Sequence, residues 1–201
     1  MERKFTEREL YVTDGEYSIF PIVDEDREDY VELCRQINGE DTYYLDPYLK
    51  DMMWEQTLKE ETKIFSIFDS SGEYCGSIEV QKPSSDTPEI GIDLLESRRN
   101  KGIAAKAVKM VAKRTYEERK VEYFVIRILS GNLHSKHVFE KMGVILIGEE
   151  ESEFTLFMKG LKKIVGNKDI SDITNKLKKR FGETKEEEVV YKYKLTPEIF
   201  S

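Results

Sequence analysis

The sequence contains little cysteine and little histidine, which limits the sites it can build. Its two cysteines, Cys34 and Cys75, lie far apart without metal-ligand spacing, so neither a disulfide framework nor a zinc site is expected. The two histidines, His134 and His137, are three positions apart and lack a third ligand beside them. We therefore expect no metal, with the cysteines as small core residues and the histidines as solvated or packing residues of a helix.

Long hydrophobic runs are also missing. No stretch approaches the roughly 20 apolar residues that a membrane helix needs, and the opening MERKFTEREL has no apolar segment of the signal-peptide kind. The sequence thus predicts a soluble, cytoplasmic protein with no membrane partner. Its 201 residues are enough for one domain with a single core, spanning residues 1–201.

An overall excess of positive charge is missing as well, since the net charge is -8 at pH 7. Nonspecific nucleic-acid binding rests on a basic surface, so nucleic acid is not an expected partner. The positive charge is instead concentrated in one segment. From Glu96 to Lys120, nine basic residues stand against three acidic ones, a local net charge of +6. This segment is the first candidate for a binding site.

Two hydrophobic periods divide the chain into strands and helices. Alternating or β-branched runs predict strands at about residues 17–23, 63–69, 73–81, 88–95, 122–129, 144–150 and 188–195. Helical spacing with capping signals predicts helices at about residues 24–38, 46–61, 102–119, 132–143, 154–165 and 171–181. The strands in 63–95 indicate an antiparallel meander, whereas the strand, helix, strand series in 88–129 implies a crossover and a parallel pair. The last two helices are expected to form a helical insertion at about 152–186, between the final two strands.

The stretch SRRNKGIAAKAV, residues 97–108, joins a strand to a helix through a basic loop with one glycine. Such a junction aims unpaired backbone N–H groups and the positive end of a helix dipole at one point, where anions bind. Gly102 allows close approach to the backbone, and Ala104 and Ala105 leave space beside it. A phosphate fits this description, although the Walker and dinucleotide-binding glycine patterns are absent. Taken alone, the junction is equally consistent with a helix that begins with a solvated basic turn.

The junction resembles motif A of the GNAT N-acetyltransferases. The family pattern of Arg or Gln, two residues, Gly, one residue, and Gly or Ala stands here as Arg99, Gly102 and Ala104. The preceding EIGIDLLESRR resembles the strand that enters this loop in the RimJ/RimL-like branch. A second family motif follows at the expected distance, formed by Asn132, Ser135, Phe139, Glu140, Lys141, Gly143 and Val144. The resemblance covers about residues 64–148 and says nothing specific about 151–188.

The resemblance implies an α+β fold with three α/β/α layers. The expected sheet is mixed and mostly antiparallel, with about six to seven strands and helices on both faces. Strands 4 and 5 are expected to diverge in a V-shaped splay, where a bulge separates them. The resemblance also implies acetyl-CoA as the co-substrate and an amine as the acceptor.

The same resemblance assigns residues to the cofactor. The diphosphate is expected at Arg99 and on the backbone amides of Asn100, Lys101, Gly102, Ile103, Ala104 and Ala105. The pantetheine arm is expected to add a pseudo-strand beside Ile92, Asp93 and Leu94. Asn132 is expected to bond to this arm, and Ser135 is expected to face the same cleft one helical turn later.

Amide formation needs an amine that has lost its proton, and Glu89 is the predicted base. Alternation along PEIGIDL places Glu89, Gly91 and Asp93 on one face of the strand. Glu89 also resembles the acidic residue of the family's E-I-G strand. A solvated strand carboxylate is the alternative for Glu89 and the preferred interpretation of Asp93.

One departure from the family concerns the departing thiolate. Several relatives have a tyrosine that protonates it, seven residues after the asparagine, and this chain has Phe139 there. Tyr191 or Tyr193 of the last strand is an alternative donor, and the thiolate is also able to leave unprotonated. Two hypotheses stay open: a working amine acetyltransferase that relies mainly on positioning, and an acyl-CoA-binding module without turnover.

Neither motif identifies the acceptor, which is expected to be a primary amine of a small molecule or of a peptide or protein N-terminus. The insertion is predicted to wall the acceptor side with its apolar residues packed inward, namely Phe154, Phe157, Leu161 and Ile164. Acidic residues in 24–29 and 149–153 would steer a cationic amine. The alternative is an insertion that makes a dimer contact and leaves specificity to 41–54. The protein is expected to be a monomer or a homodimer.

Overall fold

The computed structural model describes residues 8–38, 46–59, 61–165 and 189–200. The strands are β1 Val12–Thr13, β2 Tyr17–Pro21, β3 Thr62–Asp69, β4 Tyr74–Gln81, β5 Glu89–Leu94, β6 Phe124–Leu129, β7 Ile145–Glu151 and β8 Val189–Leu195. The helices are α1 Arg27–Asn38, α3 Pro47–Lys59, α4 Ile103–Glu118, α5 Leu133–Met142, α6 Glu153–Val165 and α8 Pro197–Phe200, with 3-10 turns at Asp24–Asp26 and Glu96–Arg98. The helix predicted at 171–181 lies outside the described residues.

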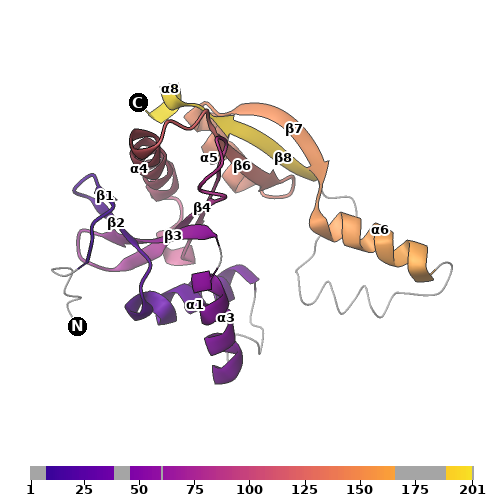
Figure 1. Ribbon diagram of the computed structural model, residues 1–201, viewed down its shortest axis with the longest axis horizontal. Coiled ribbons are helices and arrows are strands. Elements are labelled where there is room, and N and C mark those ends of the chain that lie inside the picture. Colours follow the sequence, from indigo (N-terminus) through magenta and orange to yellow (C-terminus); the bar gives the residue numbers. More distant parts are fainter. Residues whose placement is uncertain (1–7, 39–45, 60, 166–188, 201) are drawn as a thin grey trace.

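The strands form one mixed sheet in the order β1-β2-β3-β4-β5-β6-β8-β7 (Figure 1). All neighbouring strands are antiparallel except β5 and β6, which are parallel because α4 crosses between them. The predicted α+β fold, with its parallel pair and its mostly antiparallel sheet, is confirmed. Within the described residues the sheet has eight strands rather than six or seven, because the two-residue β1 is too short to show an alternating pattern.

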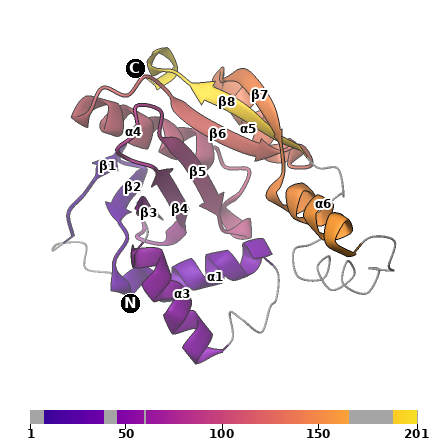
Figure 2. The ribbon, with the colours of Figure 1, turned by 45° about the vertical axis from the view of Figure 1, so that its right-hand side comes forward.

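Helices cover both faces of the sheet, and β3 shows how the sequence divides between them. Phe65 and Ile67 face a core that includes Ala107 and Val111 of α4. The alternate residue Phe68 packs with Leu33 of α1 on the other face. A strand buried on both faces contains few polar residues, and in β3 only Ser66 interrupts the buried apolar residues from Ile64 to Phe68. The layers α4, sheet and α1 with α3 can be followed in Figure 2.

The helix ends follow the predicted capping signals around the two motifs. In α5 the Asn132 side chain caps the first turn by accepting a hydrogen bond from the Ser135 N–H at 3.0 Å, and Gly143 ends the helix in the left-handed region with φ 93°. In α4 the buried Ala107, Val108 and Val111 recur at helical spacing and face the sheet. The second motif therefore positions α5 through its own end residues.

The sheet divides between β5 and β6. The two strands pair at one position, Glu89 with Val125, and a hydrogen bond joins the Val125 N–H to the Pro88 carbonyl oxygen at 2.9 Å. Beyond this point no pairing joins the described parts of the two strands, so they form a V that is closed at Glu89 and open at Leu94. The predicted splay is confirmed.

The expected bulge is not found in the ladder between β4 and β5, which keeps its register from Gln81–Glu89 to Gly76–Leu94. A register shift occurs instead between β3 and β4, at Ile67 and Phe68. The splay is thus a divergence of two regular strands. At its open end Gly76 lies against β5, with φ 155° and with the Asp93 carbonyl oxygen 2.1 Å from the place a Cβ would occupy.

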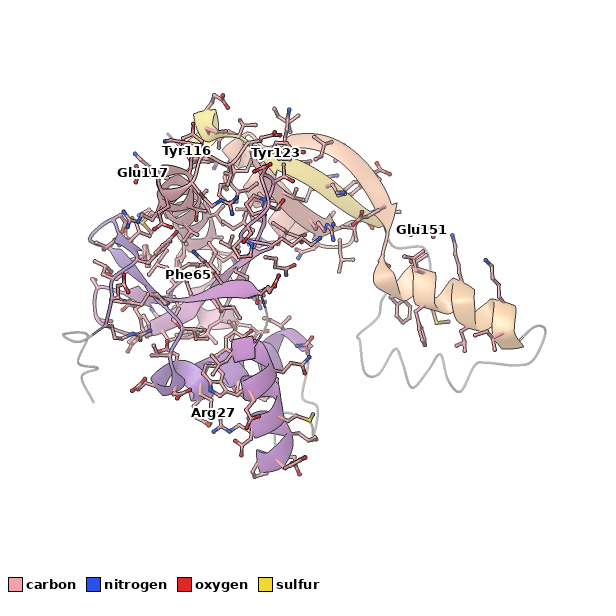
Figure 3. All side chains as sticks on the ribbon, viewed as in Figure 1. Arg27, Phe65, Tyr116, Glu117, Tyr123 and Glu151 are labelled. Atoms are coloured by element: carbon pink, nitrogen blue, oxygen red, sulfur yellow. The ribbon has the colours of Figure 1, made fainter. Side chains whose placement is uncertain are left out.

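We call β1 to β5 with α1, α3 and α4 the first half, and β6 to β8 with α5 and α6 the second half. Figure 3 shows side chains crowded around the sheet, whereas the side chains drawn on α6 stand apart from the rest of the molecule. In the second half β7 forms the edge of the sheet and exposes Ile145, Leu146 and Ile147. Past Glu151, α6 runs away from the rest of the molecule in Figures 1 and 2.

The inward packing predicted for the insertion is wrong for two of its residues. Phe157 and Ile164 are exposed, Ile164 by 85%. Because α6 leaves the sheet and extends outward, its described residues do not lie over α1 or α3 in either view. Its own beginning is well defined, since Ser152 caps it by accepting a hydrogen bond from the Thr155 N–H at 3.1 Å.

Candidate functional site

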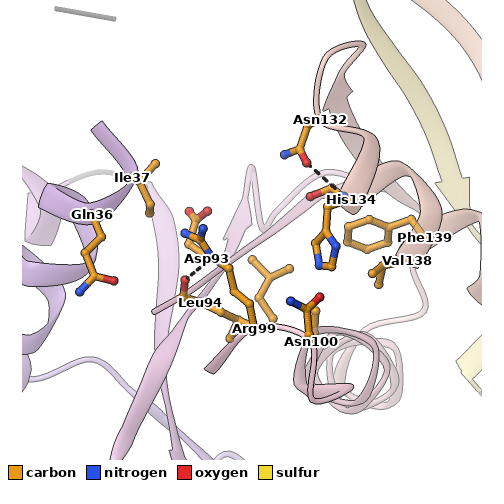
Figure 4. Close-up of a pocket in the computed structure, with 13 residues that line it drawn as sticks. Gln36, Ile37, Asp93, Leu94, Arg99, Asn100, Asn132, His134, Val138 and Phe139 are labelled. Atoms are coloured by element: carbon orange, nitrogen blue, oxygen red, sulfur yellow. Dashed lines mark hydrogen bonds between the residues drawn. The ribbon is translucent and has the colours of Figure 1, made fainter. Parts of the chain in front are cut away.

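A cavity of about 350 Å³ opens at the wide end of the V (Figure 4). It collects residues from four parts of the chain that are far apart in sequence: the end of α1, the open end of β5, the loop into α4, and the first turns of α5. The lining residues are Gln36, Ile37, Ile92, Asp93, Leu94, Arg99, Asn100, Ala104, Asn132, His134, Ser135, Val138 and Phe139.

The loop between β5 and α4 has the backbone shape that the anion-site prediction needs. Asn100 and Gly102 both adopt left-handed conformations, with φ 62° and 77°. Gly102 occupies the N-cap of α4 and has no side chain with which to cap it. The first intrahelical bond runs from the Lys106 N–H to the Gly102 carbonyl, so the earlier N–H groups of the turn have no intrahelical acceptor. Their partial positive charge is available to an anion.

The basic side chains of this loop have different surroundings. Arg98 bonds to Asp69 at 2.7 Å and also to Glu73, so its charge is held on the first half of the sheet. Arg99 lines the cavity, and its Nε donates to the Leu94 carbonyl oxygen at 3.1 Å. Lys101 is exposed outside the lining residues. Arg99 is therefore the cation that faces the cavity from this loop.

Eight of the predicted cofactor residues line the cavity together: Ile92, Asp93, Leu94, Arg99, Asn100, Ala104, Asn132 and Ser135. Four others, Lys101, Gly102, Ile103 and Ala105, belong to the same loop and turn but are not among its lining residues. The Ile103 side chain is buried in the core beneath α4, which leaves its backbone N–H as the group that could serve a ligand. The predicted catalytic Glu89 lies outside the lining.

The cavity reaches both faces of the sheet. Ile92 and Asp93 are neighbours in β5, so their side chains point to opposite faces, and both line the cavity. Ile92 packs against the core under α4, whereas Asp93 faces the α1 side with Gln36 and Ile37 (Figure 4). The backbone N–H and C=O groups of β5 also alternate, pointing toward β4 at one residue and toward β6 at the next. Because the Leu95 N–H bonds to Cys75 of β4, the backbone groups of Ile92 and Leu94 point toward the splay.

Asp93 combines solvent access with an unusual electrostatic environment. Its side chain is exposed, but it stands in the hollow of the cavity. The protein around the carboxyl displaces water and raises its pKa above the ordinary value, while the charge of Arg99 opposes the rise. Cys34 of α1 lies on the same side of the sheet as Asp93. Burial raises the pKa of the Cys34 thiol to about 11, and the nearby charges of Asp93 and Glu79 raise it further.

Glu89 stands at the closed end of the V and is already paired. Its Oε2 lies 3.3 Å from Nε of Arg127 on β6, and the same nitrogen lies 3.3 Å from Oε1 of Glu150 on β7. Lys192 of β8 extends the network to Glu150 at 3.7 Å. The Glu89 side chain is 17% exposed. This network joins the two halves of the sheet where β5 and β6 still touch.

The two tyrosines considered as proton donors lie outside the cavity lining. Tyr193 is buried and donates a hydrogen bond from its hydroxyl to Glu140 at 3.2 Å. Burial, reinforced by that carboxylate, raises the pKa of Tyr193 to about 12. Tyr191 carries the Lys136 ammonium over its ring at 4.6 Å. Phe139, which does line the cavity, has no proton to give.

Sequence reasoning missed His134, Val138, Gln36 and Ile37. His134 follows the capping Asn132 by two positions, and its ring extends toward Asn100 across the cavity (Figure 4). Its place in the first turn of α5 was a usable signal. Gln36 and Ile37 gave none, because only the fold brings the end of α1 to β5. Gln36 secures that approach by accepting a hydrogen bond from the Glu96 N–H at 3.0 Å.

The acidic segment 24–29 is largely engaged inside the protein. Asp26 is fully buried and paired with Arg8 at 2.7 Å. Asp24 accepts a hydrogen bond from the Trp54 indole at 2.9 Å, and Glu28 pairs with Lys50. Steering of a cation by this segment is therefore weaker than its sequence indicates.

Two features are missing from the part of the chain that the structure describes. It contains no group of three or more His, Cys, Asp or Glu side chains placed to hold a metal ion. Within the same residues, no helix combines the length and apolar character needed to cross a membrane.

Comparison with solved structures identifies related folds. A mutant of the spermidine N-acetyltransferase from Vibrio cholerae superposes with a TM-score of 0.65 at 12% identity, over 93% of this chain and 97% of that one. The structure of spermidine N-acetyltransferase from Vibrio cholerae in complex with CoA and spermine gives a TM-score of 0.65 at 11% identity, over 93% of this chain and 99% of that one. At these identities the likeness shows the fold alone.

Comparison at the level of sequence gives the family. None of the curated proteins compared with the chain matches it significantly. The model of the acetyltransferase (GNAT) domain matches residues 18–145, which is more than half of the chain and includes both motifs. The chain therefore belongs to the GNAT acetyltransferases.

Proposed function

We propose that this protein is an acetyl-CoA-dependent N-acetyltransferase of the RimJ/RimL-like branch, which transfers acetyl to a primary amine. One observation carries the proposal: the cavity at the open end of the splay brings together the loop into α4, the inner edge of β5 and the capped start of α5. Each of these supplies a different kind of group, and together they match the parts of one elongated anionic cofactor.

The residues present fit acetyl-CoA. The left-handed loop at Asn100 and Gly102 and the free N–H groups of α4 suit the diphosphate, with Arg99 as its cation. Backbone groups of Ile92 and Leu94 point into the splay and are able to pair with the amides of the pantetheine arm. Asn132 uses its side-chain oxygen as the cap, which leaves the amide nitrogen as a donor toward the arm. When bound, acetyl-CoA supplies an acetyl group activated as a thioester.

The acceptor is proposed to be a small cationic amine or the N-terminus of a peptide or protein. Asp93 provides a carboxylate in the cavity on the α1 side, and the chain as a whole is acidic. The fold neighbours carry the name of spermidine N-acetyltransferases, and one is described with spermine. Polyamines are therefore the first acceptors to test, followed by aminoglycosides, amino acids and peptides with free N-termini.

The cofactor assignment is tested by adding a charge where the diphosphate would lie. Ala104→Glu places a carboxylate in the first turn of α4, where it suits the helix dipole and leaves the fold intact, but it repels phosphate. We expect acetyl-CoA affinity to fall at least about 30-fold, a loss of roughly 2 kcal/mol typical of a removed charge-assisted contact. Ala104→Gln, matched in size but neutral, should lose much less. Calorimetry that finds equal affinity in both variants would remove the diphosphate from this loop.

Turnover is tested separately by following thiol release with each amine class. Acetyl-CoA binding without thiol release for any amine would identify a binding module rather than an enzyme. Thiol release with only one class of amine would identify that class as the acceptor.

A further inference from the structure

The carboxylates of β5 occupy opposite ends of the V. Glu89, Gly91 and Asp93 share the face that looks toward α1. Asp93 lies four positions after Glu89 along the extended strand, a distance of about 13 Å. Glu89 stands where β5 and β6 are paired, and Asp93 stands where they have parted.

The space around these two groups differs. A Cβ added at Gly91 would meet nothing within 4 Å, so the strand surface beside Asp93 is open on the α1 face. Asp93 lines the cavity there, with Gln36 and Ile37 opposite. Glu89, by contrast, is covered and holds the Arg127 guanidinium. To take a proton from an amine, Glu89 would have to share or give up the ion pair that links the two halves.

From this geometry we propose that Asp93, rather than Glu89, is the carboxylate that accepts the proton of the amine, directly or through one water. The proposal rests on the proposed acetyltransferase function. The cavity passes through the splay, so a cofactor arm lying between β5 and β6 meets the α1 face at Asp93. An amine that approaches from this face then lies between the carboxylate and the thioester.

The proton and electron balance is simple. An ammonium R–NH₃⁺ gives one proton to the Asp93 carboxylate, and the lone pair that is freed forms the C–N bond to the acetyl carbon. The C–S bond breaks with its electron pair left on sulfur. The amide nitrogen loses its second proton through water to that thiolate, and Asp93 returns its own proton to solvent. Phe139 takes no part in these transfers because it has no ionisable group.

The groups that face Asp93 determine its titration. Arg99 approaches from the loop and favours the carboxylate, whereas Cys34 on α1 and Glu79 on β4 lie on the same sheet face. His134 borders the cavity from α5, so its contribution has to be separated from that of Asp93 in any pH measurement. Displacement of water in the hollow raises the pKa of Asp93 above its ordinary value, which makes the carboxylate a better proton acceptor.

The test compares three variants with the wild type across pH 5 to pH 10, with acetyl-CoA and the best acceptor from the amine screen. Asp93→Asn should lower kcat by roughly 10²-fold at pH 7 and by much less near pH 10, where the free amine is abundant. The part of the low-pH limb that belongs to Asp93 should disappear, which leaves only the rise toward pH 10 that follows the free amine. Glu89→Gln should keep the acid limb, and His134→Gln should show whether any part of that limb belongs to the imidazole. The opposite pattern, with the limb lost in Glu89→Gln and kept in Asp93→Asn, would overturn the proposal.

A second measurement does not depend on turnover. In protein labelled with ¹³C at aspartate side chains, the resonance missing from Asp93→Asn identifies this carboxyl, and its titration should have a midpoint above the ordinary aspartate value of about 3.9. Calorimetry should give acetyl-CoA affinity within about threefold of wild type in Asp93→Asn, since its backbone groups are unchanged. Wild-type protein that fails to bind acetyl-CoA would refute the proposed function. Binding and turnover with an unchanged pH profile in Asp93→Asn would refute this inference alone.

Discussion

The two halves of the sheet are built from similar strands but are covered differently. In the first half β3 is buried on both faces, between α4 and α1. In the second half β7 exposes three consecutive apolar residues, Ile145, Leu146 and Ile147. The first half also contains the fully buried Asp26, whereas the charges of β7 and β8 lie partly in solvent.

This difference indicates where stability resides. Substitutions at close backbone contacts or at buried charges cause large losses of stability. Substitutions on a solvent-exposed edge strand usually change stability little. The first half should therefore determine whether the protein folds. The second half completes the cavity through α5 and should be more permissive. The following substitutions test this contrast.

The largest difference is expected between a glycine of β4, Gly76, and a glycine of β7, Gly148. Gly76→Val would place a Cβ 2.1 Å from the Asp93 carbonyl oxygen and 2.8 Å from the Leu94 Cα, at a φ of 155°. Backbone cannot yield as a flexible side chain does, so the free energy of unfolding should fall by about 3 kcal/mol or more. Gly148→Ala in β7 meets nothing within 4 Å and should change it by less than about 1 kcal/mol, in the stabilising direction. Urea denaturation measures both, and equal losses would abolish the contrast.

The next effect concerns charge. Asp26 is fully buried and accepts hydrogen bonds from Arg8 at 2.7 and 2.9 Å and from the Ser66 hydroxyl at 2.7 Å. Asp26→Asn leaves the Arg8 guanidinium without its counter-charge, so the free energy of unfolding should fall by about 3 kcal/mol. Glu150→Gln removes a half-exposed carboxylate from Arg127 and Lys192 and should change it by less than about 1 kcal/mol. A larger loss for Glu150→Gln would show that the second half depends on its charge network.

The smallest effect is expected on the surface of α1. Hydrogen bonds from Arg35, and then from Gln36, lower the pKa of Glu32 to about 2. Since an unfolded glutamate has a pKa near 4.3, this pair contributes stability above about pH 4.3 and loses it as the pH falls toward 2. Glu32 is 43% exposed, which limits the contribution to less than about 1 kcal/mol. The free energy of unfolding differs between pH 7 and pH 3, and Arg35→Gln should reduce that difference by less than about 1 kcal/mol. Urea denaturation at the two pH values measures this. A larger change would mean that the first half also depends on surface charge.

The sequence predicted the local parts of this molecule well, because their signals are local. Asn132 and Gly143 marked the ends of α5, and Gly102 marked the start of α4, since capping depends on neighbouring residues. The parallel pair of β5 and β6 followed from the crossover helix alone. Chain order and helix geometry were sufficient for these features.

Features that depend on distant segments were harder to predict. Alternation put Glu89 and Asp93 on one face of β5 but could not show which of them is paired, because Arg127 lies on another strand. Gln36 reaches the cavity only through the packing of α1 against the sheet. The apolar period of α6 predicted a helix, yet it did not indicate whether Phe157 and Ile164 would meet the body of the protein. Periodicity identifies an apolar face without naming its partner.

The pairing of β5 and β6 at one position, Glu89 with Val125, has a consequence for solubility. An open sheet ordinarily has two edges, whereas this one has two more inside it, along the diverging parts of β5 and β6. Edges attract other strands, and proteins protect them with charge or with covering segments. Here Arg99 bonds to the Leu94 carbonyl on one internal edge, and Asp93 stands beside it. A strand-like ligand in the splay would cover both internal edges at once, so the filled protein should resist self-association better than the empty one.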